Sequence, residues 1–276
     1  MKPAIVLLHS SMSSKAQWAA LSAELAAQYD CIALDLLGYG EAPFPHGATA
    51  NGFDSNGGNG GNSGNAGAAS YRHTLAHEAD AVLAALDARL APDTPFHLVG
   101  HAYGGASALH LARRLPARVL SLTLHEPVAF HLLPEDHAAR VEIVAVVAAI
   151  AASATDRDAT RRFIDYWNRP GAFDNAPPAA QDKMIAMIAK VRLDFDALLG
   201  EAAGVDDLAA LTMPALVMAG QHSPASTRLL AERLAAALPN AAAATTRGGH
   251  MGPITHADAI NPMIAAFLAG ANTPKG

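Results

Sequence analysis

The stretch Phe96-His97-Leu98-Val99-Gly100-His101-Ala102-Tyr103-Gly104-Gly105 decides the fold of this chain. Its first four residues are a short apolar run, which predicts a buried strand, and residues 106–112 predict the helix that follows. Gly100, Gly104 and Gly105 permit a tight turn and a close approach of the helix to the strand. The spacing of the glycines is that of a nucleophile elbow, G-x-S-x-G, in which the turn lifts a serine hydroxyl above a parallel sheet.

Position 102 is alanine, so this elbow has no hydroxyl. An alanine does not itself require so strained a turn. The sequence therefore predicts the geometry of a nucleophile site from which the nucleophilic atom is missing.

Short apolar runs alternate with longer amphipathic stretches along the rest of the chain. Strands are predicted at 4–8, 31–35, 96–99, 119–124, 215–219 and 242–247. Helices are predicted at 15–28, 71–90, 105–115, 225–238 and 257–268. Strands separated by helices need crossover connections, so we expect an α/β fold with a mostly parallel sheet of about six strands flanked by helices.

Two insertions interrupt this alternation. Residues 43–70 are rich in Gly and Asn, which predicts a flexible surface loop. Residues 127–207 instead predict helices at 135–153, 156–167, 178–190 and 195–202. We expect 127–207 to form a helical cap, with residues 1–126 and 208–276 as the core domain.

Composition excludes several classes of function. The hydrophobic fraction of 51% is enough for a large core, and the formal charge of −6 argues against nucleic-acid binding. A single cysteine excludes disulfides within the chain and multi-cysteine metal sites. We expect no signal peptide and no membrane span, and hence a cytoplasmic protein. For the nucleophile site predicted above we expect a small-molecule acyl substrate as the partner, in a monomer or homodimer.

Two further segments are suited to acyl chemistry. The segment His9-Ser10-Ser11-Met12 leaves the first strand, where a backbone N–H of Ser11 or Met12 can bind an oxyanion together with that of Tyr103. Gly249-His250-Met251 follows the last strand, and a histidine in such a loop can reach the carboxyl edge of the sheet as a general base. We expect His250 to be the catalytic base.

Together these segments resemble the α/β-hydrolase family. The resemblance rests on His9-Ser10-Ser11, Asp35-x-x-Gly38-x-Gly40, Gly100-His101-Ala102-Tyr103-Gly104-Gly105 and Gly249-His250-Met251. It implies an α/β-hydrolase fold without the first β-hairpin, a structural role for Asp35, and a catalytic triad in the chain order nucleophile, acid, histidine.

The acid of that triad departs from the family pattern. Ser223 stands where the resemblance implies an aspartate after the strand that follows the cap. Glu126, at the end of the strand after the elbow, is a second place from which a carboxylate could reach His250. We favour Glu126 over Asp206 and Asp207, while a simple hinge role for Glu126 stays open.

No metal or cofactor is expected. His73 and His77 stand four residues apart beside Glu78, but the HExxH order is absent, and we expect two solvated helix histidines. The segment Gly38-Tyr39-Gly40 lacks the third glycine of a dinucleotide-binding loop, so no nucleotide cofactor is implied.

The alanine at position 102 has two explanations. It replaces a natural serine in a chain made to hold a substrate, or the protein naturally lacks a nucleophile and binds a ligand or works without an acyl-enzyme. We favour the first, because the elbow glycines, the oxyanion residues and His250 are all retained.

The resemblance implies hydrolysis of an ester, thioester or lactone. C–C bond hydrolysis, acyl transfer or cyclisation, and non-catalytic ligand binding are the alternatives. For contact with the substrate we expect the following residues: Ser10, Phe163, Tyr166, Trp167, Phe173 and Met251.

Overall fold

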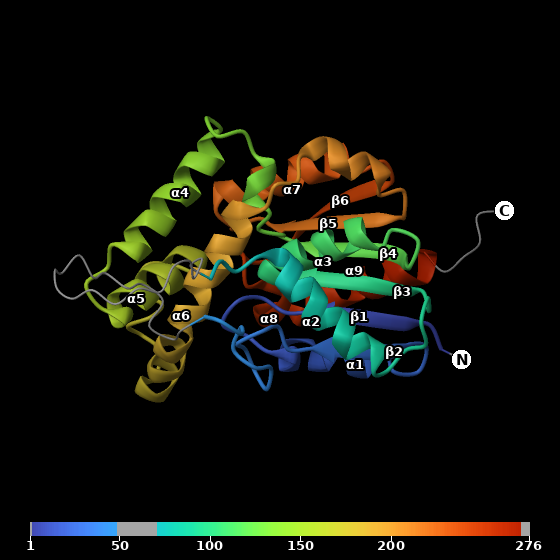
Figure 1. The fold of residues 1–276 in the computed structure, drawn as a ribbon, viewed down its shortest axis with the longest axis horizontal. Helices are drawn as coiled ribbons and strands as arrows, with labels where there is room; N and C mark the ends of the chain where they lie inside the picture. Colours follow the sequence, from blue (N-terminus) through green and yellow to red (C-terminus); the bar gives the residue numbers. More distant parts are fainter. Residues whose placement is uncertain (1, 49–70, 272–276) are drawn as a thin grey trace, which may run out of the picture.

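The structure, a computed structural model, describes residues 2–48 and 71–271, and most of the Gly/Asn-rich stretch lies outside this range. Within it, six strands form one parallel sheet in the order β2-β1-β3-β4-β5-β6 (Figure 1). The strands are β1 (Ala4–Leu8), β2 (Asp30–Leu34), β3 (Phe96–His101), β4 (Val119–His125), β5 (Ala215–Gly220) and β6 (Ala241–Thr246). The predicted α/β sheet is confirmed, and each predicted strand overlaps an observed one.

Helices cover both faces of the sheet because successive strand residues point to opposite sides. Ala4, Val6 and Leu8 of β1 belong to one core cluster, which includes α2 (Leu75–Asp87), α3 (Tyr103–Arg114) and α7 (Ala225–Ala237). Ile5 and Leu7 belong to a second cluster, with α1 (Ala19–Leu25) and α9 (Ala257–Ala271). Every residue of the central strands β1 and β3 is buried, because helices cover both faces of the sheet there.

A group of helices is inserted between β4 and β5. It contains η2 (Phe130–Leu132), α4 (Ala138–Ala151), α5 (Asp156–Trp167) and α6 (Pro178–Gly200), followed by η3 (Val205–Ala210). We call η2 to α6 the helical insertion. In Figure 1 its helices lie together beside the edge of the sheet at which β1, β3 and β4 end.

The helical insertion corrects one prediction. The sequence predicts two helices, at 178–190 and 195–202, but α6 is one helix over Pro178–Gly200. The intervening residues Val191-Arg192-Leu193-Asp194 contain neither glycine nor proline, so nothing in them ends a helix. The structure also adds a short helix that was not predicted, α8 (Gly252–Thr255), after His250.

Among the described helices, we find none that is both long enough and apolar enough to cross a lipid bilayer.

The elbow glycines let α3 approach the sheet closely. A Cβ atom added at Gly104 would lie 2.4 Å from the carbonyl oxygen of His9 and 2.5 Å from that of Leu8. One added at Gly100 would lie 2.4 Å from the carbonyl oxygen of Gly104. All these atoms are backbone, so a side chain at either position would push α3 away from β1 and β3.

We expect Gly104→Ala to lower the free energy of unfolding by about 2 kcal/mol or more, because it overpacks backbone against backbone. Gly270→Ala is the matched control, since Gly270 lies in α9 with no heavy atom within 4 Å of an added Cβ. That substitution should raise stability by up to about 1 kcal/mol. Urea denaturation measures both, and equal effects of the two substitutions would contradict the close approach of α3.

Candidate active site

The strand-to-helix turn has the backbone of a nucleophile elbow. Ala102 connects β3 to α3 with φ 51° and ψ −115°, a conformation that L-residues rarely adopt. Its N–H donates to the carbonyl of His125 at 3.0 Å, and its own carbonyl accepts from the N–H groups of Ala106 at 3.0 Å and Val128 at 3.3 Å. Backbone contacts from β4 and α3 therefore hold the turn, although its alanine has no hydroxyl to position.

His250 and Glu126 meet at the carboxyl edge of the sheet. Nδ1 of His250 lies 2.7 Å from Oε2 of Glu126. Glu126 follows β4, is fully buried and has φ 45°. Its second oxygen accepts from the N–H of Gly220 at 2.6 Å and from the Ser223 hydroxyl.

The Glu126 carboxyl is held in its ionised form. Burial alone would raise its pKa, but the hydrogen bond and charge of His250, with contributions from His125 and Ser223, hold the pKa well below its usual range. A buried carboxylate on Nδ1 fixes the tautomer of the histidine, so that Nε2 is the nitrogen able to accept a proton.

The other positions considered for the acid do not contribute a carboxylate to His250. Ser223, at the place of the expected aspartate, donates a hydrogen bond to the Glu126 carboxylate. Asp206 and Asp207 lie in η3, where Asp207 accepts from the N–H of Gly204 at 2.8 Å and lies 3.8 Å from Arg113.

Two neighbouring rings restrict the movement of His250. The Trp167 ring, from α5, stacks on the imidazole with centroids 4.2 Å apart and planes inclined by 30°. Nε2 of His101 lies 2.8 Å from the backbone carbonyl of His250, and burial lowers the pKa of His101 well below its ordinary value. A neutral His101 with its proton on Nε2 donates to that carbonyl.

The loop after β1 is suited to oxyanion binding. Burial lowers the pKa of His9 to about 4, so the ring is neutral. Its Nδ1 lies 2.7 Å from the carbonyl oxygen of Ser10, and its Nε2 accepts a hydrogen bond from the N–H of Leu36 at 3.0 Å. Met12 has φ 55° and lines the same cavity as Ser11. Of these two expected donors we take the N–H of Ser11 as the candidate, because the Ser11 side chain is held by a 2.6 Å hydrogen bond to Asp194.

The second candidate donor is the N–H of Tyr103. Tyr103 is the first residue of α3, where backbone N–H groups have no partner within the helix. The partial positive charge of the helix N-terminus adds to its attraction for an anion.

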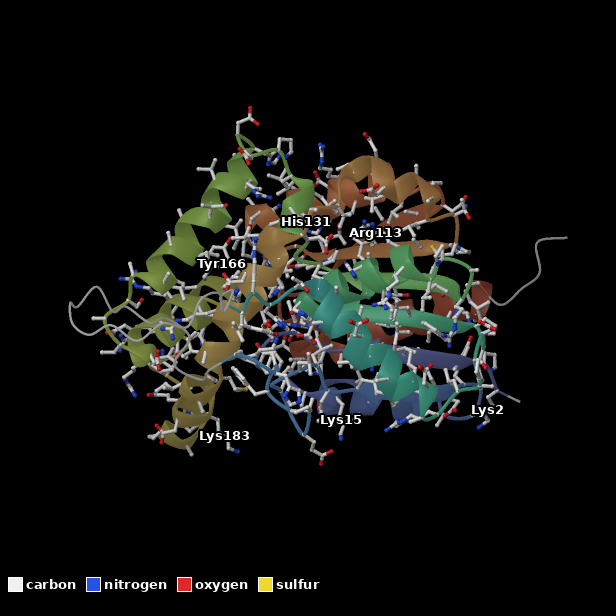
Figure 2. The ribbon with its side chains drawn as sticks, in the orientation of Figure 1. Lys2, Lys15, Arg113, His131, Tyr166 and Lys183 are labelled. Carbon is white, nitrogen blue, oxygen red and sulfur yellow. The ribbon has the colours of Figure 1, made fainter. Side chains whose placement is uncertain are left out.

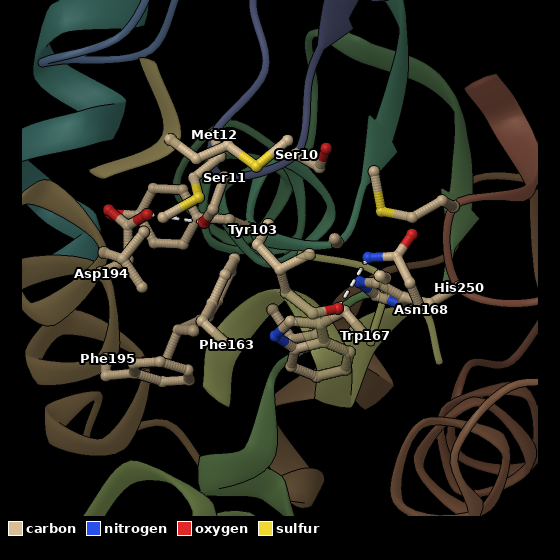
Figure 3. Close-up of a pocket in the computed structure, with 18 residues that line it drawn as sticks. Ser10, Ser11, Met12, Tyr103, Phe163, Trp167, Asn168, Asp194, Phe195 and His250 are labelled. Carbon is tan, nitrogen blue, oxygen red and sulfur yellow. Dashed lines mark hydrogen bonds between the residues drawn. The ribbon is translucent and has the colours of Figure 1, made fainter. Parts of the chain in front are cut away.

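A cavity of about 250 Å³ lies between these groups and the helical insertion (Figure 3). Its polar lining comes from Ser10, Ser11, Tyr103, Asn168 and His250, with Asp194 on the side opposite His250. Helices α5 and α6 contribute most of its apolar wall: Phe163, Ile164, Trp167, Met184, Val191, Phe195 and Leu198. The enclosure suits a small, largely apolar ligand.

Most predicted site residues lie around this cavity. It is lined by Ser10, Ser11, Met12, Ala102, Tyr103, Phe163, Trp167, His250 and Met251, with Glu126 behind His250. Tyr166 and Phe173, which were also expected to contact the substrate, do not line this cavity. Tyr166 lies among the helices (Figure 2), where its hydroxyl is 2.8 Å from Oε1 of Glu142 and 2.7 Å from the Ser226 hydroxyl. The guanidinium groups of Arg157 and Arg161 lie over the ring of Phe173.

Tyr166 points elsewhere because it neighbours Trp167 on a helix, where successive side chains are about 100° apart. The α6 part of the wall was not predicted. Met184, Val191, Phe195 and Leu198 are separated by seven, four and three residues, which places them on one face of a continuous helix. The prediction of two separate helices for this segment did not place these four residues on a common face.

A buried charged cluster lies next to the cavity. Lys190 Nζ is 2.9 Å from Oε1 of Glu78 and is also bonded to Asp194. His73 is buried, with Nε2 2.9 Å from Glu78, so the expectation that it is solvated is wrong. His73, Glu78 and Asp194 come close enough to surround a metal ion, but the ammonium of Lys190 already binds both carboxylates and provides the positive charge.

Comparison with known proteins finds similar sequences and similar folds. The chain is 31% identical over 221 residues to "Putative carbamate hydrolase RutD" of Variovorax paradoxus, covering 73% of this chain and 76% of the relative. The protein of that name from Caulobacter vibrioides is 29% identical over 215 residues, covering 72% and 74%. The enol-lactonase of Burkholderia xenovorans superposes with a TM-score of 0.72 at 19% identity, covering 98% of this chain and 92% of that one.

The family model described as alpha/beta hydrolase fold matches residues 3–257. Fold, connectivity and sequence agree, and the chain belongs to the α/β hydrolase fold family.

Proposed function

We propose that this site hydrolyses a small, neutral carbonyl compound with a heteroatom leaving group, and that His250 is the general base. One observation carries the proposal: the 2.7 Å contact between His250 Nδ1 and the buried Glu126 carboxylate, beside a cavity that reaches the elbow. Glu126 supports the imidazolium that forms when Nε2 of His250 takes a proton. The N–H groups of Ser11 and Tyr103 stabilise the oxyanion.

With serine at position 102, the reaction proceeds through an acyl-enzyme. His250 takes the hydroxyl proton while the serine oxygen attacks the carbonyl carbon, and the leaving group departs with that proton. Water, deprotonated by His250, then releases the acyl group. The positive φ of residue 102 supports this route, because the elbow is the turn that presents a serine hydroxyl.

With alanine at position 102, only water can serve as the nucleophile. His250 activates it directly, and the oxyanion donors act as before. Binding and oxyanion stabilisation alone leave a rate about 10³–10⁴-fold above that in water. We predict that Ala102 replaces a natural serine, and the natural gene sequence tests this prediction.

The relatives named as carbamate hydrolases fit the same chemistry. A carbamate, like an ester, thioester or lactone, has a carbonyl next to a heteroatom leaving group, and its attack also forms a tetrahedral oxyanion. In this proposal the helical insertion acts as a cap, since α5 and α6 supply most of the apolar wall that keeps bulk water from the carbonyl.

The first test restores the hydroxyl. We expect Ala102→Ser, here called the serine form, to hydrolyse 4-nitrophenyl butyrate at least about 10³-fold faster than the alanine chain, because it regains covalent catalysis. It should also be labelled by a fluorophosphonate probe, whereas the alanine chain should not. His250→Ala in the serine form is the control and should abolish both. An unlabelled, inactive serine form that still binds ligand would instead support a non-catalytic binding protein.

The second test concerns the acid. In the serine form, Glu126→Gln should lower kcat by about 10²–10⁴-fold, because the neutral amide neither fixes the tautomer nor supports the imidazolium. Ser223→Ala removes a single hydrogen bond to the same carboxylate and should cost less than about tenfold. A loss below tenfold for Glu126→Gln would exclude Glu126 as the acid.

The third test concerns the charge of the acyl group. Asp194 is the one carboxylate in the described lining of the cavity, and that lining contains no lysine or arginine. The serine form should therefore prefer 4-nitrophenyl butyrate over 4-nitrophenyl hydrogen succinate by at least about tenfold in kcat/KM, since like charges repel in a poorly solvated site. Rates with hydroxide alone correct for intrinsic reactivity. Equal kcat/KM values would contradict a site for neutral acyl groups.

A further inference from the structure

Two buried carboxylates each bind the side chain of one oxyanion residue. The Ser11 hydroxyl donates to Oδ2 of Asp194 at 2.6 Å. The Tyr103 hydroxyl donates to Oε1 of Glu78 at 3.1 Å. Since the backbone N–H groups of Ser11 and Tyr103 are the two candidate oxyanion donors, both of these residues are held through their side chains.

Lys190 joins the two carboxylates. Its Nζ lies 2.9 Å from Oε1 of Glu78 and is also bonded to Oδ1 of Asp194. The same nitrogen lies 4.7 Å from the ring centroid of Tyr103 and 5.0 Å from that of Tyr39, within range of cation–π attraction. Lys190 and Asp194 stand four residues apart on α6, whereas Glu78 is on α2 in the core.

We propose that Lys190 is a positioning residue for the oxyanion hole: through Asp194 and Glu78 it fixes Ser11 and Tyr103, and so makes the placement of their N–H groups depend on the docking of α6. The inference rests on the proposed function, because it assumes that these N–H groups bind an oxyanion.

Lys190 stabilises the ionised form of both carboxylates, although burial and the neighbouring charge of Glu78 raise the pKa of Asp194 above its ordinary value. Burial alone would lower the pKa of Lys190, but the carboxylates of Asp194 and Glu78 raise it above its ordinary value. Burial alone would raise the pKa of Glu78, but Lys190 and His73 lower it to about 2. Lys190 and Glu78 are therefore ionised at neutral pH.

Stability does not by itself explain such a cluster. Buried ion pairs can often be replaced by apolar residues of similar volume without loss of stability. Catalysis, in contrast, is sensitive to placement, because an error of about 1 Å can cost about 10²-fold in rate. Here the hydrogen bonds of Asp194 and Glu78 end on Ser11 and Tyr103, whose N–H groups must be placed accurately to bind an oxyanion.

The first experiment separates the network from the rest of the insertion. In the serine form, Lys190→Met/Asp194→Asn removes one charge of each sign and leaves the net charge unchanged, while the amide introduced at position 194 can still accept hydrogen bonds. Ser11→Ala and Tyr103→Phe each remove one side-chain link and keep the backbone N–H. His110→Ala is the control, since it breaks a 2.8 Å contact between α3 and Glu201, at the end of α6, without touching either oxyanion residue.

We expect kcat to fall about 10- to 100-fold in the double variant and about tenfold in each single variant, with KM changed less than about threefold. A trifluoromethyl ketone that mimics the tetrahedral intermediate should lose affinity in parallel with kcat/KM. His110→Ala should stay within about twofold of the serine form. Circular dichroism and thermal unfolding establish that each variant is folded.

The second experiment needs no turnover and uses the alanine chain as it exists. Butylphosphonate places a negative oxygen in the oxyanion hole, whereas butyl methyl sulfone has a similar shape and no charge. Quenching of tryptophan fluorescence measures the binding of both, since Trp167 lines the cavity. The double variant and Tyr103→Phe should weaken phosphonate binding at least tenfold and leave sulfone binding within twofold.

The two experiments distinguish the two proposals. An inactive serine form together with network-dependent phosphonate binding would overturn the proposed function and support the positioning of the anion site. An active serine form whose kcat and phosphonate affinity are unchanged in the double variant would overturn the role of Lys190. Equal losses for phosphonate and sulfone would also overturn it, because they would indicate a general disturbance of the cavity.

Discussion

The site depends on a backbone constraint at the carboxyl edge of the sheet. Among the described residues other than glycine, four have positive φ, and three of them follow neighbouring strands: Met12 after β1, Ala102 after β3 and Glu126 after β4, with φ of 55°, 51° and 45°. Such conformations cost about 1–3 kcal/mol each and persist only where the surroundings impose them. Here they turn the chain sharply at three adjacent strand ends, so that the oxyanion loop, the elbow and the acid share one edge.

The rest of the site follows from that edge. Backbone hydrogen bonds join neighbouring strand ends: the N–H of Ala102 donates to the carbonyl of His125, and that of Glu126 donates to the carbonyl of Met218. Each turn is therefore held in part by the next strand. Glu126 then points toward the loop after β6, which carries His250. The helical insertion, which begins at Phe130, closes the space above these turns with α5 and α6.

Much of this arrangement could be predicted from the sequence, because it is encoded locally. Buried parallel strands are continuous apolar runs, and the elbow is a fixed spacing of glycines. Glu126 could be proposed because strand ends in a parallel sheet share one edge. The face of a helix is less visible: Trp167 and Tyr166 are equivalent in composition, yet Trp167 stacks on His250 and Tyr166 contacts Glu142. The cluster of Lys190, Asp194 and Glu78 could not be predicted, since its charges are buried only after α6 has docked on α2 and α3.

The spacing of these contacts along the chain has a consequence for folding. Ser11 and Asp194 are separated by 183 residues, Glu78 and Lys190 by 112, and Glu126 and His250 by 124. Contacts of such long range close large loops, whose entropy is lost before the contacts contribute stability. Transferring Lys190 and two carboxylates out of water is also unfavourable until all three are together. The charged cluster should therefore form only together with the packing of α6 on the core, and the site exists only when nearly the whole chain is native.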